Sequence, residues 1–207
     1  MSVDLDAKTR GKREETKASN RQAIIDAARR VFAELGYGAT TVRDIIRATD
    51  LASGTFYNYF KSKEEVFQAL QDETALRVRP RLRAERIRAR NFEEFISGSF
   101  RTFFDFVKND RTTFATMRSN HPEMSRVRID TPEVIAGFDE LRADLEVAIE
   151  NGVVPDTDPN LLMASIVGVA FEVAHEMLTR DLAVEDTAKF ATALFLGGVQ
   201  ALPKRKA

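Results

Sequence analysis

The sequence predicts an all-α protein in which a small N-terminal helical domain precedes a larger C-terminal one, with about nine helices in total. Apolar residues recur three and four positions apart through most of the 207 residues, which is the period of a helix face. Asn, Asp, Gly and Pro separate these runs and mark the expected helix ends. An apolar content of 43% can bury a substantial core, so disorder is not indicated.

Residues 1–18 are predicted to be a flexible basic arm. They are polar, with five Lys or Arg residues among acidic ones, and nothing after Leu5 is apolar enough to pack. Such arms either reach along a nucleic acid or remain plain flexible tails, and the sequence leaves both alternatives open.

Residues 19–65 are predicted to form the small domain. A support helix begins near Asn20 and stops at Gly36 and Gly38, since glycine is typical of helix C-termini. One face of this helix is apolar and is expected to be buried: Ile24, Ala27, Ala28, Val31, Phe32 and Leu35.

The first of two short helices follows Thr40 and Thr41, either of which can cap its free amides. Its apolar residues share one face: Val42, Ile45 and Ile46. Only four residues, 50–53, separate it from the next helix, so the chain must cross sharply there. We expect Ser53 to cap the second helix.

The second helix is expected from about Gly54 to Tyr59. Phe56 and Phe60 are four residues apart and should face inward, which turns the polar side chains between them outward. These outward residues are Thr55, Tyr57, Asn58 and Tyr59. Hydroxyl and amide groups can bond to phosphates and base edges without burying a charge, so the pair of helices is typical of a helix-turn-helix that binds DNA.

The following helix is expected to begin at Ser62, with Glu65 completing a capping box. Lys63 lies in its first turn, where a cation opposes the helix dipole. A phosphate bound nearby would explain a cation there, so Lys63 is predicted to hold a phosphate.

The segment TTVRDIIRATDLASGTFYNYFKSKEE, residues 40–65, resembles the DNA-binding domain of the tetracycline-repressor (TetR) family of bacterial transcription regulators, and the resemblance extends over residues 28–70. Asp50 departs from it, since the family usually has Gly there, and Ala52-Ser53 replaces a common Ser-Lys pair. The resemblance implies phosphate contacts at the helix ends and base contacts in the second helix. The implied DNA-binding residues are Thr41, Ser53, Gly54, Thr55, Tyr57, Asn58, Tyr59 and Lys63.

The charge distribution agrees with DNA binding at this end of the chain. Residues 1–63 hold 12 Lys or Arg against 8 Asp or Glu, whereas the other 144 residues hold 19 against 24. The net charge of −1 therefore hides a basic N-terminal part, which would attract phosphate. A merely solvated surface is the alternative.

Residues 66–80 are predicted to form a helix that connects the two domains and breaks at Pro80. The densest run of cations surrounds this proline: Arg77, Arg79, Arg81, Arg83, Arg86, Arg88 and Arg90. The run is either a solvated surface or a set of contacts to acidic residues of a neighbouring helix or subunit. Direct binding of DNA is a third alternative.

Residues 81–207 are predicted to form an effector-binding and dimerisation domain, as the resemblance implies. A long helix over residues 92–107 carries one stripe of apolar residues: Phe92, Phe95, Ile96, Phe100, Phe103, Phe104 and Val107. Most are expected in an ordinary core, but part of the stripe is a candidate wall for an apolar ligand. The candidate pocket residues are Phe100, Phe103, Phe104, Met117, Phe138, Phe171 and His175.

A short helix through Phe114 and Met117 is followed by a segment with little apolar periodicity, predicted to be a loop or frayed helix between Ser119 and Thr131. This segment carries His121, Arg126 and Arg128. Pro132 then opens a helix that ends near Gly152, and its apolar positions share one face.

The last two helices, about residues 159–179 and 186–202, are apolar on more than one side. A helix that is apolar all round must be covered all round. Small residues on both helices permit close approach, so we predict a homodimer in which each chain contributes this pair.

Several classes of function are not predicted. The chain has no cysteine and only two histidines, His121 and His175, and it has neither a glycine-rich phosphate loop nor a G-x-S-x-G turn. No enzyme activity, metal, cofactor, membrane span or secretion signal is therefore expected, and a cytoplasmic location is the default. His175 either senses ligand or pH or is simply a hydrogen-bonded helix residue.

These observations predict a homodimeric repressor that a small, hydrophobic effector releases from a near-palindromic operator. One alternative is a helical small-molecule-binding protein or enzyme whose helix-turn-helix is only structural. Another is an activator or architectural dimer that binds DNA without a ligand.

Overall fold

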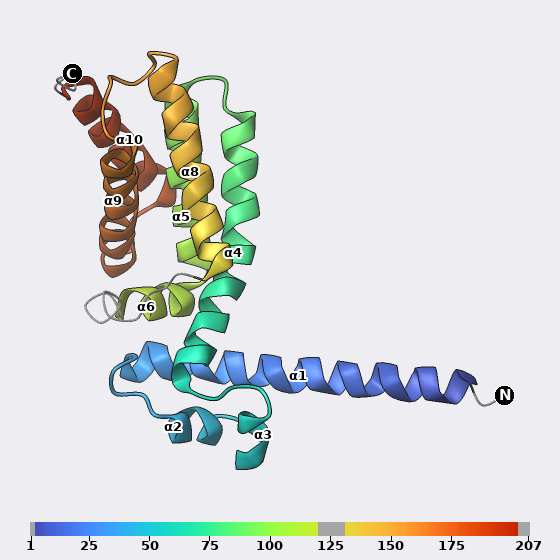
Figure 1. Ribbon diagram of the computed structural model, residues 1–207. Helices are drawn as coiled ribbons and strands as arrows, with labels where there is room; N and C mark the ends of the chain where they lie inside the picture. Colours follow the sequence, from blue (N-terminus) through green and yellow to red (C-terminus); the bar gives the residue numbers. More distant parts are fainter. Residues whose placement is uncertain (1–2, 120–130, 203–207) are drawn as a thin grey trace. The chain divides into compact units, whose positions relative to one another are not determined.

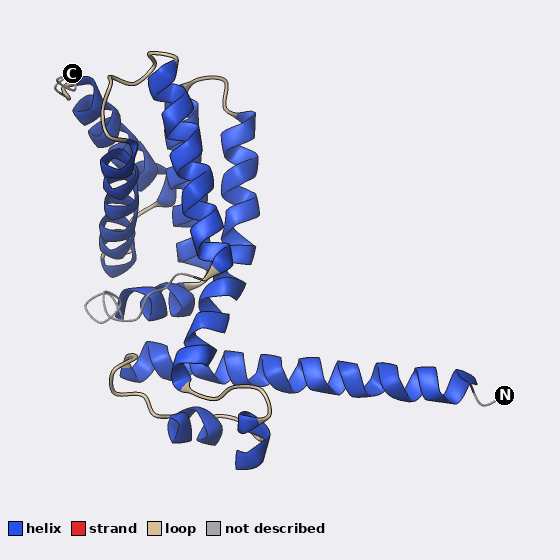
Figure 2. Cartoon of the chain, in the orientation of Figure 1, coloured by secondary structure: helices blue, strands red, loops and turns tan. Residues whose placement is uncertain are grey.

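The computed structural model describes residues 3–119 and 131–202, and within these ranges every regular element is a helix. Figure 2 shows the helices joined by short loops. The nine helices of the described residues confirm the predicted all-α class. The predicted loop with His121, Arg126 and Arg128 lies outside the described residues.

The chain divides into two compact units, which we describe separately. The first comprises residues 1–71 and 115–129, and the second comprises residues 72–114 and 130–207. Helices α4, Lys63–Arg88, and α6, Arg111–Ser119, each begin in one unit and end in the other.

The first unit is built from α1, Val3–Leu35, α2, Val42–Arg47, α3, Ser53–Tyr57, and the start of α4 (Figure 1). The expected face of α1 is buried against the aromatic and aliphatic side chains of the shorter helices, except at its end, where Leu35 is 51% exposed, so its expected burial is wrong. The buried residues of this core are Ile24, Ile25, Ala27, Ala28, Phe32, Tyr37, Ile45, Phe56, Phe60, Val66, Phe67 and Leu70.

Helix α1 begins at Val3, much earlier than the start expected near Asn20. Residues 3–18, predicted to be a flexible arm, are therefore helical. The physical reason is that a lack of apolar residues removes packing but not helix propensity. Glu, Lys, Arg and Ala favour the helix by themselves.

The caps of the short helices were predicted only in part. Thr41 caps α2, and its hydroxyl and amide both bond to the carboxylate of Asp44, completing a capping box. The prediction that Ser53 caps α3 is wrong, because Ala52 holds the cap position without a side-chain bond and Ser53 is already in the helix. Ser62 accepts from the amide of Glu65, as a helix cap does.

Helix α4 continues through Pro80 to Arg88, so the predicted break is wrong. Proline removes one helical hydrogen bond and crowds the preceding turn, but it does not by itself end a helix that is held by neighbours. Arg79 and Arg86, on either side of Pro80, form ion pairs with acidic residues of α8, Pro132–Glu150, and these contacts support both halves.

Four helices share the core of the second unit: α5 (Phe92–Asn109), α8, α9 (Pro159–Thr179) and α10 (Val184–Gln200). Helix α5 supplies the centre of the core, as its apolar stripe predicted. The buried residues are Ile96, Phe100, Phe104, Phe106, Val107, Phe114, Leu145, Val154, Leu162, Ile166, Ala170, Ala174, Met177, Ala188, Ala191, Phe195 and Val199.

Candidate nucleic-acid interface

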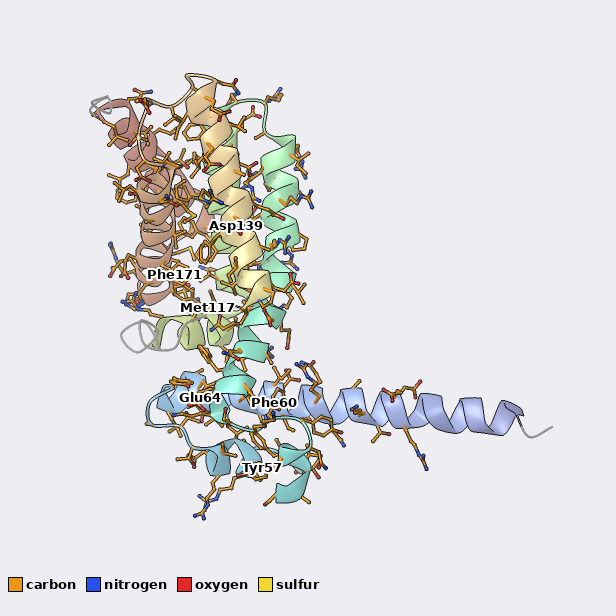
Figure 3. The ribbon with its side chains drawn as sticks, in the orientation of Figure 1. Tyr57, Phe60, Glu64, Met117, Asp139 and Phe171 are labelled. Atoms are coloured by element: carbon orange, nitrogen blue, oxygen red, sulfur yellow. The ribbon has the colours of Figure 1, made fainter. Side chains whose placement is uncertain are left out.

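Helix α3 presents polar side chains because two phenylalanines hold it from the other side. Phe56 and Phe60 are 2% and 4% exposed, whereas Tyr57 is 61% exposed and Asn58 is also on the surface. The Tyr57 ring meets the buried Phe56 ring edge to face at 5.3 Å, which limits where it can point. Figure 3 shows Tyr57 on the side of the unit away from α1, and Phe60 near α1. The predicted inward and outward faces are as expected.

The other predicted DNA-binding residues in and beside α3 differ in their exposure. Ser53 and Gly54 are exposed in its first turn, while Thr55 and Tyr59 are half-buried. A side chain at Gly54 would meet nothing within 4 Å, so a large ligand can approach the backbone there. The surface around α3 can therefore accept or donate hydrogen bonds over one exposed face.

Thr41 lies at the exposed start of α2, but its hydroxyl is engaged. It donates to an oxygen of Asp44 at 2.6 Å and accepts from the Asp44 amide at 3.3 Å. The hydrogen bonds from the Thr41 hydroxyl and amide hold the pKa of Asp44 below its ordinary value. A phosphate at Thr41 would have to compete with this carboxylate.

Lys63 has partners within the protein that the sequence did not predict. Its ammonium group donates to the carbonyl oxygens of Tyr37 at 2.8 Å, Thr40 at 2.9 Å and Gly38 at 3.4 Å. These acceptors explain how a cation is stable in the first turn of α4 without a phosphate.

Basic residues that the sequence reasoning passed over also lie on this unit. Arg43 and Arg47 are exposed one turn apart on α2, and Lys61 is exposed just before α4. Arg43 and Arg47 are four residues apart, on the side of α2 opposite the buried Ile45, and this spacing in the sequence indicates an exposed basic face. The guanidinium of Arg21 lies 5.3 Å from the centre of the Phe60 ring, so its partner is an aromatic face.

The predicted effector residues fall into separate environments. Phe100 and Phe104 stack in the core of the second unit, and Phe100 also meets Phe195. Phe103 and Phe171 are only half-buried, and they form an aromatic triad with Phe114 in which ring centres lie 5.4 to 6.4 Å apart.

Three candidate pocket residues do not join this triad through any described ring contact. Phe138 is 41% exposed on α8 and lies outside the buried core. His175 is half-buried one turn after Phe171 on α9. Met117 is half-buried in the part of α6 that belongs to the first unit (Figure 3).

Helices α9 and α10 pack together and carry an outward face rich in small and apolar residues. Leu161, Phe190 and Leu194 are 68%, 60% and 54% exposed. Side chains added at Gly168, Gly197 or Gly198 would meet nothing within 4 Å. This face is defined by Leu161, Ala164, Ser165, Gly168, Phe190, Ala193, Leu194, Gly197 and Gly198.

In the described part of the chain, α9 alone is long and apolar enough to cross a membrane by length and composition. That evidence is weak, because a core helix of a soluble protein passes the same test. Glu172 and Glu176 lie on the exposed side of this helix, where hydrocarbon would be a costly environment.

The arginine run mostly faces acidic residues, which supports the second of its three readings. Arg79 binds Glu133 and Glu140, and Arg86 binds Glu140 and Asp144. The hydrogen bond from Arg79 lowers the pKa of Glu140, and burial offsets part of that effect. Elsewhere in the run, three arginines pair with Asp110, Glu85 and Glu94: Arg77, Arg88 and Arg90.

No group of three or more acidic or histidine side chains that could hold a metal ion occurs among the described residues. The first unit does offer exposed hydrogen-bonding groups on α3 and exposed arginines on α2, which suit phosphate and base contacts.

Comparisons with known proteins point to the same region. Residues 24–70 match the family model for bacterial regulatory proteins of the tetR family. The chain is 31% identical over 105 residues to an uncharacterized HTH-type transcriptional regulator of Haemophilus influenzae, covering 50% of this chain and 51% of that protein. It is 43% identical over 60 residues to the HTH-type transcriptional repressor AcnR of Corynebacterium efficiens, covering 29% of this chain and 32% of that protein. The match therefore spans about half or less of these curated relatives.

Solved structures resemble the chain over a greater length. The fatty acid degradation regulator FadR from Bacillus halodurans superposes with a TM-score of 0.73 at 28% identity, covering 87% of this chain and 96% of that one. The transcriptional regulator FadR from Bacillus subtilis, solved in complex with stearoyl-CoA, gives a TM-score of 0.71 at 24% identity, covering 86% and 98%. The second likeness concerns the fold alone.

Proposed function

We propose that this chain is a transcriptional repressor of the TetR family of bacterial regulatory proteins, whose family model its residues 24–70 match. It acts in the cytoplasm as a homodimer, binds a near-palindromic operator, and leaves it when a small apolar effector binds. The observation that carries this proposal is the exposed face of α3, where Tyr57 and Asn58 stand outward from a buried Phe56.

In this proposal α3 enters the major groove, and its side chains bond to base edges. Thr55, Tyr57 and Asn58 are the base-contacting residues, while Ser53, Gly54 and Tyr59 lie against the backbone. Exposed arginines on α2, Arg43 and Arg47, add phosphate contacts that depend on salt. Thr41 assists at the start of α2 if its hydroxyl turns from Asp44 to a phosphate.

The outward face of α9 and α10 forms the dimer interface in this proposal. Exposed Leu161, Phe190 and Leu194 would be removed from water, and the glycines leave room for close contact between helices. Two copies of the same face make a two-fold interface, and the resulting pair of DNA-binding domains matches a palindromic operator.

The effector is proposed to be a hydrophobic molecule that contacts the aromatic triad of Phe103, Phe114 and Phe171, in which Phe103 and Phe171 are half-buried and Phe114 is buried. Support comes from the aromatic character of this triad and from the likeness to the fatty acid degradation regulator of Bacillus halodurans. Binding releases DNA only if the effector prefers the conformation that cannot reach both half-sites. Stearoyl-CoA, found in the Bacillus subtilis structure, is the first compound to test.

The proposal is tested by selecting binding sequences from a random duplex pool with the purified chain. We expect a near-palindromic sequence, protection of that sequence in footprinting, and loss of protection on adding stearoyl-CoA or another long-chain acyl compound. No enriched sequence and no protection, together with turnover of a small molecule, would favour the alternative of a binding protein or enzyme. DNA protection that no acyl compound changes would support a regulator with a different effector or none.

A further inference from the structure

The ammonium group of Lys63 already has hydrogen-bond acceptors within the protein. Lys63 begins α4, where two glutamates in the first turn suit the helix dipole and a lysine does not. Its ammonium group has three N–H donors, and three carbonyl oxygens lie within reach at 2.8, 2.9 and 3.4 Å. All three belong to the loop between α1 and α2, at Tyr37, Gly38 and Thr40.

An aromatic ring also contacts the ammonium group of Lys63. The Lys63 nitrogen lies 4.5 Å from the centre of the Tyr37 ring, within the range of a cation–π contact. The ring is itself fixed, because Tyr37 is 5% exposed and packs against Phe32 and Phe67. Its hydroxyl donates to Glu64 at 2.9 Å, so both of the first two residues of α4 hold Tyr37.

The loop that Lys63 holds leads directly into the helix-turn-helix. Gly36 has a φ of +77°, which lets the chain turn at the end of α1. Thr40 is 1% exposed and its hydroxyl bonds back to the Gly36 carbonyl at 2.7 Å. The next residue, Thr41, caps α2. The position of the first turn of α2 therefore depends on a loop whose carbonyl groups converge on one ammonium.

From this geometry we infer that Lys63 is a positioning residue of the DNA-binding domain: it holds the α1–α2 loop closed and fixes the start of α2, and it does not bind phosphate itself. The inference rests on the proposed function, since the positioned elements are those that contact DNA. A phosphate could take the Lys63 ammonium only by breaking hydrogen bonds to carbonyls that would then need other donors.

The test compares two substitutions of Lys63 with one of Lys61, which is exposed two residues earlier. Lys63→Met keeps the length of the side chain and removes the charge. Lys63→Arg keeps the charge and favours phosphate, but a planar guanidinium cannot place its donors on three converging carbonyls as an ammonium does. Lys61→Met removes a charge of the same kind from the surface.

Operator affinity is measured against salt concentration, below the unfolding temperature of every variant. We expect Lys63→Met and Lys63→Arg each to weaken binding about tenfold or more with the salt slope unchanged, since no phosphate contact is lost. Amide hydrogen exchange at Asp44 and Ile45, at the start of α2, should speed up in both variants and stay unchanged in Lys61→Met.

Three outcomes would overturn the inference. If Lys63→Met lowers the salt slope by about 0.9 while Lys63→Arg binds normally, Lys63 contacts a phosphate. If both variants lose thermal stability but the folded proteins keep full operator affinity, Lys63 is only structural. Should the native chain bind no DNA at all, the proposed function fails, and unchanged hydrogen exchange in Lys63→Met would separately refute the role in holding α2.

Discussion

Arg79 donates two hydrogen bonds to the same carboxylate oxygen of Glu140, from Nε at 3.0 Å and from Nη2 at 2.7 Å. The other oxygen of Glu140 accepts from Arg86 at 3.1 Å. Glu140, on α8, thus joins two arginines of α4 that lie on opposite sides of Pro80. This arrangement gives α4 a support outside its own backbone where the proline removes a hydrogen bond.

Replacement of Glu140 by Gln should make stability depend less on pH. The hydrogen bond from Arg79 places the pKa of Glu140 below 4.5, its ordinary value, so folding favours the charged form. Its stabilisation is therefore fully present above about pH 4.5 and lost as pH falls through the lowered pKa. We expect Glu140→Gln to reduce the free energy of unfolding by about 1 kcal/mol at neutral pH, measured by urea unfolding. The difference in the free energy of unfolding between Glu140→Gln and the native chain should become smaller towards pH 3.

Asp105→Asn, on the exposed side of α5 and outside its first turn, is the matched control for this measurement. It removes a carboxylate outside the arginine network and should leave both stability and its dependence on pH nearly unchanged. An equal loss in both variants would mean that Glu140 contributes no more than a general surface charge.

Replacement of Tyr57 by Ala should weaken operator binding without changing the fold. Tyr57 is 61% exposed, so its removal costs little stability, while a base or backbone contact would be lost. We expect a loss of 1–3 kcal/mol, about fivefold to 150-fold in Kd, in a gel-shift titration at fixed salt. The dimer should remain intact by sedimentation.

Leu76→Ala provides the comparison for Tyr57→Ala, because Leu76 is also a large exposed side chain, at 56%, but lies on α4 outside the helix-turn-helix. Unchanged operator affinity in Tyr57→Ala, or an equal loss in both variants, would count against the assignment of α3 as the DNA-reading helix.

Replacement of Gly197 by Arg should dissociate the proposed dimer. Nothing lies within 4 Å of a Cβ atom built at this exposed position, so a side chain can leave the helix there without a clash at its base, and the substitution also raises helix propensity. In a close helix interface, however, the same side chain would be both bulky and charged. We expect monomers in sedimentation equilibrium at concentrations where the native chain is dimeric, with helical circular dichroism unchanged.

Ala84→Arg, at an exposed position of α4, introduces the same side chain outside that face and should remain dimeric. A Gly197→Arg protein that keeps its dimer would show that the outward face of α9 and α10 is not the interface.

Replacement of Phe171 by Ala should impair the response to effector, because its ring contacts Phe103 at 5.4 Å and Phe114 at 5.8 Å in the aromatic triad. We expect the effector to release operator DNA from this variant only at a concentration at least tenfold higher than from the native chain. Loss of the packed ring should also lower the unfolding free energy by about 2 kcal/mol, less than for a fully buried phenylalanine.

Phe138→Ala serves as the contrast, since Phe138 is 41% exposed on α8 and has no described aromatic contact with the triad. Release should be unchanged in this variant and stability should fall by less than about 1 kcal/mol. The reverse pattern, with Phe138 essential and Phe171 dispensable, would move the effector site from α9 to the exposed side of α8.

Sequence patterns predicted the faces of helices better than their ends. Phe56 and Phe60 are buried and Tyr57 is exposed because residues four apart share a helix side whatever surrounds the helix. The cap of α3 and the path of α4 through Pro80 were predicted wrongly, since small differences in backbone geometry and contacts with distant residues decide where a helix starts or stops.

The sequence by itself determined the helical class, the helix-turn-helix with its inward and outward sides, and the apolar stripe that became the core of α5. Each follows from local periodicity, which a chain carries before it folds. Only the tertiary structure decided which partner each charge has. Lys63 binds the carbonyl groups of the α1–α2 loop, 23 to 26 residues earlier, and Arg79 binds Glu140, 61 residues later. The packing of the helices determines these partners, because no residue spacing in the sequence specifies a contact between residues that are so far apart along the chain.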